Sequence, residues 1–227
     1  MRRTIYFLVV LSLCLCGCYE MKLTEEKSAT ELMTDGLERF EDRDYRTAAT
    51  AFRRVTDWYP FSEHVTLAEL KIADAYYKIR QYDQAASAYN EFANLHPQNS
   101  SAPFALYQVG RCFFDRTDTI DRDQENARKA YLAFRRFLNR HPDSEYAGAV
   151  DAHIKECQRS IAANELLVAK YYLKRKNYKA ALARFQKILE DYPDIGVQHI
   201  ALQYLPQCEA LVEAEASKAG ESPPGDP

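Results

Sequence analysis

The stretch Ala85-Ala-Ser-Ala-Tyr89-Asn-Glu-Phe92-Ala-Asn-Leu-His-Pro97 decides the fold, because its pattern recurs along the chain. An alanine is followed by apolar residues four and seven positions later and by a proline twelve positions later. Offsets of 4 and 7 place side chains on one face of an α-helix, and proline stops a helix. The four copies are Ala48, Phe52, Val55, Pro60; Ala85, Tyr89, Phe92, Pro97; Ala130, Phe134, Phe137, Pro142; and Ala181, Phe185, Ile188, Pro193.

A second apolar pattern precedes each copy and supplies a partner helix. Its residues are Leu32, Gly36, Phe40; Ile72, Ala73, Tyr76; Leu106, Val109, Gly110, Phe113; and Val168, Ala169, Tyr172. Helix pairs repeated in tandem at this spacing are typical of tetratricopeptide (TPR) repeats. We therefore predict an all-α, TPR-type helical-repeat solenoid of about four and a half repeats, wound as a right-handed superhelix.

The repeat array is predicted to occupy residues 29–214, with N-terminal repeats over 29–142 and C-terminal repeats over 143–214. No Pro or Gly separates the stretch that follows Tyr146 from the helix that runs to about Arg175, so the two are compatible with one long helix. From about Val197 to Ala214 a further helix resembles the first half of a fifth repeat. Residues 215–227 are rich in Gly, Pro and Ser and are predicted to be disordered.

The first residues read as a targeting segment. Arg2 and Arg3 precede a short apolar run that ends in Leu15-Cys-Gly-Cys18, a pattern that resembles a lipobox. We predict a lipoprotein signal peptide over residues 1–17, a lipid on Cys18 and a lipid-anchored linker over residues 18–28. An ordinary signal peptide cleaved at small residues is the alternative. The acyl chains on Cys18 would attach the protein to the membrane. No cofactor is predicted.

Three cysteines besides Cys18 remain in the mature chain: Cys112, Cys157 and Cys208. Three thiols cannot all pair with one another, so we interpret them as small buried hydrophobic residues. A bridge between Cys112 and Cys157 is the alternative.

Composition and motifs argue against an enzyme and against a nucleic-acid partner. The formal charge of −3 gives no basic field for duplex nucleic acid. The five histidines are scattered without a zinc-type spacing, so no metal site is predicted, and we find no phosphate loop or nucleophile elbow. An enzyme acting on peptidoglycan is a poor alternative, because no remaining segment is long enough for a catalytic domain.

The charged insertion between Asp115 and Gln124 has two interpretations. In one, Asp121, Arg122 and Asp123 form a structured lip beside a concave binding face. In the other, Asp121 or Asp123 caps the helix that begins near Glu125. Curved helical arrays bind peptides or partner helices on such faces.

Several short motifs resemble the BamD family of outer-membrane assembly lipoproteins. They are Tyr59-Pro-Phe-Ser62, Ala75-Tyr-Tyr-Lys78, Asp121-Arg-Asp123 leading into Ala127-Arg128, Tyr146 after Pro142-Asp-Ser144, Glu165-Leu-Leu-Val-Ala-Lys-Tyr-Tyr172, and Asp191-Tyr-Pro-Asp194. The resemblance extends from the lipobox to about Leu205. Tyr19 after the lipidated Cys would, by the same resemblance, permit sorting to the outer membrane.

The resemblance implies a non-enzymatic scaffold on the periplasmic face of the outer membrane. Its N-terminal repeats would bind unfolded barrel substrates in a groove of Phe61, Tyr76, Tyr77, Phe104, Tyr107 and Arg111, with Arg111 near the substrate carboxylate. Its C-terminal repeats would dock onto the POTRA domains of the BamA subunit, with Tyr172 and His199 as candidates and other Bam subunits as further partners. His199 stands where relatives carry an Arg, which puts an ion pair there in doubt. Another TPR envelope lipoprotein, such as a secretin pilotin or a cell-envelope coordination factor, is the alternative.

Overall fold

A computed structural model describes residues 27–193 and 195–220, and within these residues the chain is helical without strands. The helices are α2 (Ala29–Glu41), α3 (Tyr45–Trp58), α4 (Val65–Lys78), α5 (Tyr82–Leu95), α6 (Ala102–Phe114), α7 (Glu125–Arg140), α8 (Ala147–Lys174), α9 (Tyr178–Asp191) and α10 (Gln198–Gly220). Each helix packs chiefly on its neighbours in sequence. The predicted all-α repeat fold is confirmed.

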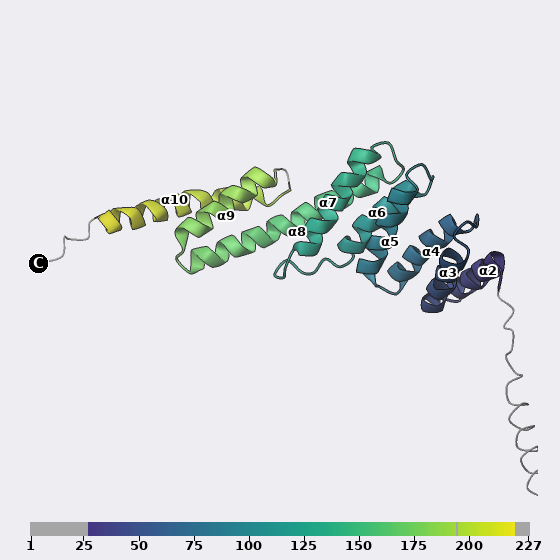
Figure 1. Cartoon of the computed structure of the whole chain (residues 1–227). Helices are drawn as coiled ribbons and strands as arrows, with labels where there is room; N and C mark the ends of the chain where they lie inside the picture. The colour runs from purple at the N-terminus through teal and green to yellow at the C-terminus, as the bar shows by residue number, and fades with distance from the viewer. Residues whose placement is uncertain (1–26, 194, 221–227) are drawn as a thin grey trace, which may run out of the picture.

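The helix pairs stack side by side into an elongated, curved array (Figure 1). The residues of the repeated frame form its centre, since Phe52, Phe134 and Phe185 are each 0% exposed. In the first and third repeats a glycine of the first helix admits the ring of the second. A Cβ built on Gly110 would lie 2.2 Å from the Phe134 ring, and one on Gly36 would lie 2.5 Å from Phe52.

Three of the four turns within repeats share one backbone geometry. Arg43, Arg80 and Lys176 have φ of 64°, 61° and 60°, the left-handed region that glycine usually occupies after a helix. The residue after each donates its N–H back to the preceding helix, as Gln81 does to the Tyr76 carbonyl at 2.9 Å. This Schellman turn leads directly into the second helix. The third repeat has the charged insertion in place of this turn.

Helix α8 belongs to both halves of the array. It spans 28 residues from Ala147 to Lys174 without a break, as its sequence allowed. Its first part packs on α7 and its last part pairs with α9, so one rigid element joins the N-terminal repeats to the C-terminal repeat (Figure 1).

The core has three clusters, one in the first repeat, one across the second and third repeats, and one in the C-terminal repeat. Cys112, Cys157 and Cys208 are buried free thiols within them, as the interpretation of small hydrophobic residues requires. Burial raises the pKa of the Cys112 and Cys157 thiols to about 12, so both stay protonated.

The C-terminal boundary differs from the expectation. Helix α10 continues to Gly220, so residues 215–220 are helical and do not belong to a disordered tail. Ala216, Lys218 and Ala219 are good helix formers, and this local preference extends the helix beyond its packed part. Residues 221–227, like the signal peptide and Cys18, lie outside the described residues.

Candidate functional site: a tyrosine–arginine cluster and its surroundings

Three of the six predicted groove residues meet at one point between α4 and α6. Tyr77 donates its hydroxyl hydrogen to the Asp115 carboxylate. The Arg111 guanidinium donates to Asp115 at 3.2 Å, to the Tyr107 hydroxyl at 3.2 Å and to the Tyr77 hydroxyl at 3.4 Å. We call Tyr77, Tyr107, Arg111 and Asp115 the tyrosine–arginine cluster. It joins the second repeat to the third through polar contacts at a partly exposed surface.

The electrostatics of the cluster keep Arg111 charged and Tyr77 neutral. Burial and the hydrogen bond to Asp115 raise the pKa of Tyr77. Burial alone would lower the pKa of Arg111, but the hydrogen bond to Tyr107 and the charge of Asp115 more than offset it and raise that pKa. The cluster therefore offers a fixed, charged guanidinium beside the neutral phenol of Tyr77. The Arg111 guanidinium already forms an ion pair with the Asp115 carboxylate.

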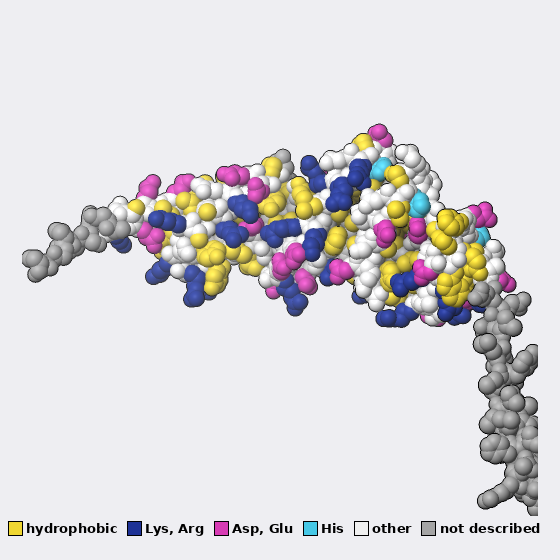
Figure 2. All heavy atoms as spheres, viewed as in Figure 1, with side chains coloured by type: hydrophobic (Ala, Val, Ile, Leu, Met, Phe, Trp, Pro, Cys, Tyr) yellow, Lys and Arg dark blue, Asp and Glu magenta, His cyan; other side chains and the backbone are white. Residues whose placement is uncertain are grey.

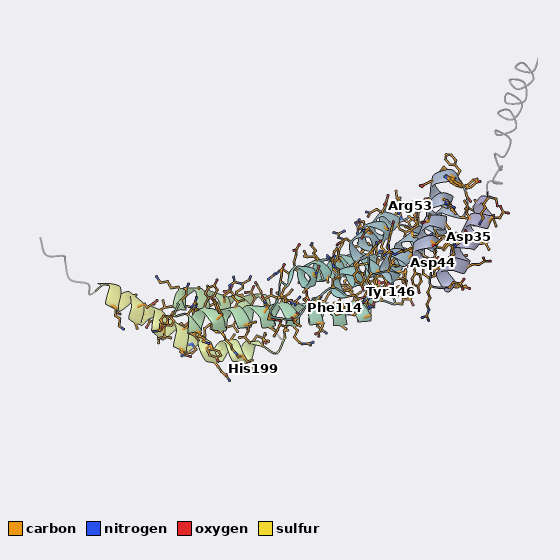
Figure 3. All side chains as sticks on the ribbon, turned by 90° about the horizontal axis from the view of Figure 1, so that it is seen from below. Asp35, Asp44, Arg53, Phe114, Tyr146 and His199 are labelled. Atoms are coloured by element: carbon orange, nitrogen blue, oxygen red, sulfur yellow. The ribbon has the colours of Figure 1, made fainter. Side chains whose placement is uncertain are left out.

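An aromatic wall continues the cluster toward α8. Tyr107 stacks on Tyr146 with ring centroids 5.1 Å apart and planes at 14°. His153 lies between Phe114, at 4.5 Å, and Phe134, at 5.2 Å. Burial and the nearby Arg111 charge lower the pKa of His153, partly offset by Asp115. Figure 3 shows Phe114 and Tyr146 on the N-terminal side of the array, well apart from His199.

Of the other three predicted groove residues, Tyr76 and Phe61 lie apart from the cluster, whereas Phe104 contacts the aromatic wall. Tyr76 turns toward α3, where its hydroxyl accepts a hydrogen bond from Arg53. Phe104 packs near the start of α6, in contact with Tyr89 and Tyr146. Phe61 is 100% exposed in the turn before α4. Val65, which opens α4, and Tyr76 are about 16 Å apart along the axis, since each helical residue rises ~1.5 Å, so Phe61 and the cluster lie at opposite ends of α4.

The charged insertion lies against the middle of α8. The Asn164 side chain donates to the Ile120 carbonyl at 2.7 Å. Gln124, which is 1% exposed, accepts a hydrogen bond from Ser160 at 2.7 Å. These hydrogen bonds attach the insertion of the third repeat to α8. The first residue of the insertion, Asp115, belongs to the tyrosine–arginine cluster.

The three predicted lip residues have exposed side chains. Asp123, one residue before Gln124, accepts from the Glu125 N–H at 3.1 Å. Gln124 stands at the N-cap position of α7 without a side-chain capping bond. Arg122 pairs with Asp118 at 3.8 Å. Asp121 bonds to Thr119, which lowers the pKa of its carboxyl.

The two docking candidates occupy different environments in the C-terminal repeat. Tyr172 is half-buried and packs against the C-terminal core. His199 is exposed in the first turn of α10, close in sequence to Leu202, which is 56% exposed. His199 is thus the more exposed of the two, whereas Tyr172 lies partly inside the helix pair.

Sequence reasoning missed the buried carboxylate of Glu165. This residue is 0% exposed, and its carboxylate accepts hydrogen bonds from Arg184 and, at 3.1 Å, from Lys187. Arg128 lies 3.6 Å away. Desolvation would raise the pKa of Glu165, but the bonds from Arg184 and Lys187 lower it. A signal existed in the sequence: Ile161 and Ala169, one turn away on either side, are both apolar, which places Glu165 on the buried face.

Among the described residues, no group of three or more His, Cys, Asp or Glu side chains is placed to hold a metal ion. None of the described helices combines the length and the apolar character that a membrane span needs.

Comparison with known proteins identifies the family of the chain. The model of the YfiO family, described as outer membrane lipoprotein, matches residues 25–222. A protein of Neisseria meningitidis serogroup A named outer membrane protein assembly factor BamD is 30% identical over 88% of this chain and 76% of its own length. The protein of the same name from serogroup B is 32% identical over 76% of this chain and 68% of its own length.

A third relative of that name, from Caulobacter vibrioides, is 30% identical over 73% of this chain and 54% of its own length. The family model covers all nine described helices, and the relatives span both halves of the array. The chain belongs to the BamD (YfiO) family of outer-membrane lipoproteins.

Proposed function

We propose that this chain is the lipid-anchored scaffold subunit of an outer-membrane β-barrel assembly machine. Its relatives are named as outer membrane protein assembly factors, and this family membership is the observation that carries the proposal. The scaffold role is non-enzymatic: it brings an unfolded barrel substrate and the barrel-shaped partner together. The two halves of the array, joined by α8, divide these tasks.

The anchor in this proposal is a lipid on Cys18, which holds the helical array at the periplasmic face of the outer membrane. Two or three acyl chains contribute about 0.8 kcal/mol for each buried methylene, which makes the attachment stable. Intact-mass measurement of the membrane-extracted protein tests it. The expected mass is that of residues 18–227 plus the acyl groups. The unmodified mass of a chain cleaved elsewhere would overturn the anchor.

The substrate site in this proposal is the tyrosine–arginine cluster with the adjoining aromatic wall. An extended peptide with alternating apolar residues stacks its aromatic side chains on Tyr107 and Tyr146. Its terminal carboxylate binds Arg111, the guanidinium that Asp115 holds in the free protein. Substrate binding is therefore an exchange of carboxylates on one arginine.

Peptide affinity measured by fluorescence anisotropy tests this site. The double variant Tyr77→Ala, Arg111→Ala is expected to weaken binding of a barrel C-terminal peptide by about tenfold or more, the factor that ~1.4 kcal/mol represents. Tyr171→Ala is the matched control, because Tyr171 is 56% exposed on the first helix of the C-terminal repeat. Unchanged affinity in the double variant would exclude the cluster as the substrate site.

The exchange of carboxylates has its own test. Asp115→Asn removes the internal anion while it keeps the side-chain size, so it is expected to strengthen binding of a peptide with a free C-terminal carboxylate. The same peptide with an amidated C-terminus gains nothing from the substitution. Equal effects on both peptides would show that Arg111 does not bind the terminal carboxylate.

The partner site in this proposal is the outer surface of α10 near His199 and Leu202, which docks onto a POTRA domain. The exposed Leu202 supplies apolar contact, and His199 supplies a polar one without a permanent cation. A pull-down from detergent-extracted membranes tests it. His199→Ala with Leu202→Ala is expected to lose the POTRA-containing barrel, whereas the Tyr77, Arg111 double variant retains it. Co-purification of a secretin instead would favour the pilotin alternative.

A further inference from the structure

The two edges of the array differ in a way that the scaffold function does not explain. Successive helices are antiparallel, so the start of α2, the end of α3, the start of α4 and the end of α5 all lie at one edge. Exposed large hydrophobic side chains gather there: Trp58 at 55%, Phe61 at 100%, Leu67 at 44% and Leu95 at 59% exposed. We call these four residues the apolar edge. Figure 2 shows hydrophobic side chains on the surface toward the N-terminal end of the array, where these repeats lie.

The opposite edge of the same repeats is polar. Its turns contain Arg43, Arg80 and the charged insertion, in which Ile120 is the exposed large hydrophobic residue among those described. TPR packing needs neither edge to be apolar, because the core lies between the helices. The four exposed side chains therefore need a cause outside the fold.

The chain that leads to the anchor arrives at the apolar edge. Tyr59, between Trp58 and Phe61, donates its hydroxyl hydrogen to the Lys27 carbonyl at 2.9 Å. Thr30 and His64 are hydrogen-bonded at 3.1 Å across the same edge. Lys27 is nine residues from Cys18, and nine residues span at most ~32 Å when fully extended. The linker from a lipid on Cys18 thus joins the array at this edge.

The chemistry of the apolar edge suits a lipid headgroup region. Trp is the residue that gathers at membrane–water interfaces, since its ring is apolar and its indole N–H is polar. The Arg54 guanidinium lies 5.6 Å from the Trp58 ring centroid. If Trp58 lay at a membrane surface, this cation would lie near the lipid phosphates. Phe61 projects without any cover.

We propose that the apolar edge inserts shallowly into the membrane surface and so fixes the orientation of the array beneath the bilayer. This inference rests on the anchor at Cys18 that the proposed function includes. With the edge inserted, the N-terminal repeats stand close to the membrane at a defined angle, and the polar edge with its charged insertion points into the periplasm.

Trp58 is the single tryptophan of the chain, so tryptophan fluorescence, excited at a wavelength that tyrosine does not absorb, reports on this edge alone. The full acylated protein is reconstituted in phosphatidylcholine vesicles with or without lipids brominated in the upper acyl chain. We expect the emission to move to shorter wavelength and to fall by roughly half with the brominated lipid, because an interfacial Trp lies within contact range of it. Flotation of the same vesicles measures the anchor separately.

Two variants sharpen the measurement. Phe61→Ser with Leu95→Ser removes exposed apolar side chains without touching the core and is expected to abolish most of the quenching while flotation persists. Ile120→Ser, at the opposite edge, is the matched control and leaves quenching unchanged. Loss of quenching in the control to the same degree would contradict the assignment of the edge.

The outcomes separate the two proposals. Flotation without quenching of Trp58 overturns the inserted edge and leaves the lipid anchor standing. No flotation and no quenching overturn both. Emission that is unaffected by brominated lipid but changes on addition of a barrel-derived peptide would also overturn membrane insertion, and would assign the edge to substrate binding.

Discussion

The second and third repeats and the C-terminal repeat are built on the same helical frame but differ in how neighbouring helices are held together. In the former, Tyr89, Phe92, Phe134 and Phe137 fill the core, and aromatic rings extend to the surface as the aromatic wall. In the latter, Phe185 stacks on Tyr204 at 5.3 Å, and a buried Glu165 binds cations from α7 and α9.

Aromatic packing and a buried ion-paired carboxylate have different physical consequences. Apolar contacts are non-directional and leave surplus aromatic surface that can receive a peptide. A buried carboxylate with several donors fixes geometry, because its hydrogen bonds have preferred directions. The N-terminal half is thus suited to recognition, and the junction with the C-terminal half is suited to holding two units at a constant angle.

The largest expected effect tests whether the two halves are separate stability units. Phe134→Ala and Phe185→Ala each remove a buried ring and are expected to cost about 3–5 kcal/mol of unfolding free energy. Hydrogen exchange should rise mainly in α5–α8 for the first variant and in α9–α10 for the second, since repeats couple chiefly to neighbours. Equal loss of protection throughout the chain would show that the halves unfold as one.

The next effect concerns the buried carboxylate. Glu165→Ala leaves Arg128, Arg184 and Lys187 without their shared anion and is expected to cost about 3 kcal/mol, at the low end for a broken buried pair, because the three cations are half-exposed and can hydrate. Chemical denaturation measures it. A loss below the error of the measurement would mean that packing alone holds this junction.

Acid should weaken the same junction. The folded-state pKa of Glu165 is lowered from 4.5, so its contribution is fully present above that value and is lost as pH falls through the folded pKa. Thermal unfolding between pH 7 and pH 3 is expected to show a stability loss below pH 4.5 that is larger in the wild type than in Glu165→Ala. Parallel curves for the two proteins would contradict this assignment.

A smaller loss of stability is expected when the glycine in the first helix of a repeat is replaced by alanine. Gly110→Ala is expected to cost about 2 kcal/mol, because its methyl group forces the buried Phe134 ring to move. A methyl group added at Gly148 would meet nothing within 4 Å, so Gly148→Ala, also in a helix, is the control and should not destabilise. Thermal melts of the two variants measure the difference. Equal melting temperatures would show that Phe134 adjusts freely.

The smallest effect compares caps in the two halves. Asp44 accepts from the Thr47 N–H and Asn177 from the Ala180 N–H, each at 3.3 Å, at the start of the second helix of a repeat. Replacement of either by Ala is expected to cost ~1 kcal/mol, measured by urea denaturation. A clearly larger loss for Asn177 would show that the C-terminal repeat depends more on local helix signals than the first repeat does.

The frame of the array could be predicted from the sequence because it is local. Ala, Phe and Pro at offsets of 4, 7 and 12 report on a single helix, and the continuity of α8 followed from the lack of a helix breaker. The cluster was only partly predictable. Tyr77 and Asp115 are 38 residues apart, and their contact depends on how two repeats stack, which no local pattern encodes.

The same reasoning explains where the structure differs from the expected arrangement. Phe61 and Tyr76 were expected in one groove but lie toward opposite ends of α4, since helical rise separates them. Tyr76 and Tyr77 are adjacent but differ by about 100° around the helix axis, so they face different helices. In α10 the local helix preference of residues 215–220 outweighed their lack of packing.

Because helix α8 is unbroken, a small tilt at one of its ends would displace the other end. Its 28 residues extend about 42 Å, and a tilt of ~5° at one end would displace the other by ~4 Å. A partner that shifts α9 and α10 by a small rotation would therefore move Tyr146 and His153, near the far end, by a distance comparable to a side chain. Binding of a partner near α10 would then change the position of the aromatic wall without any change of secondary structure.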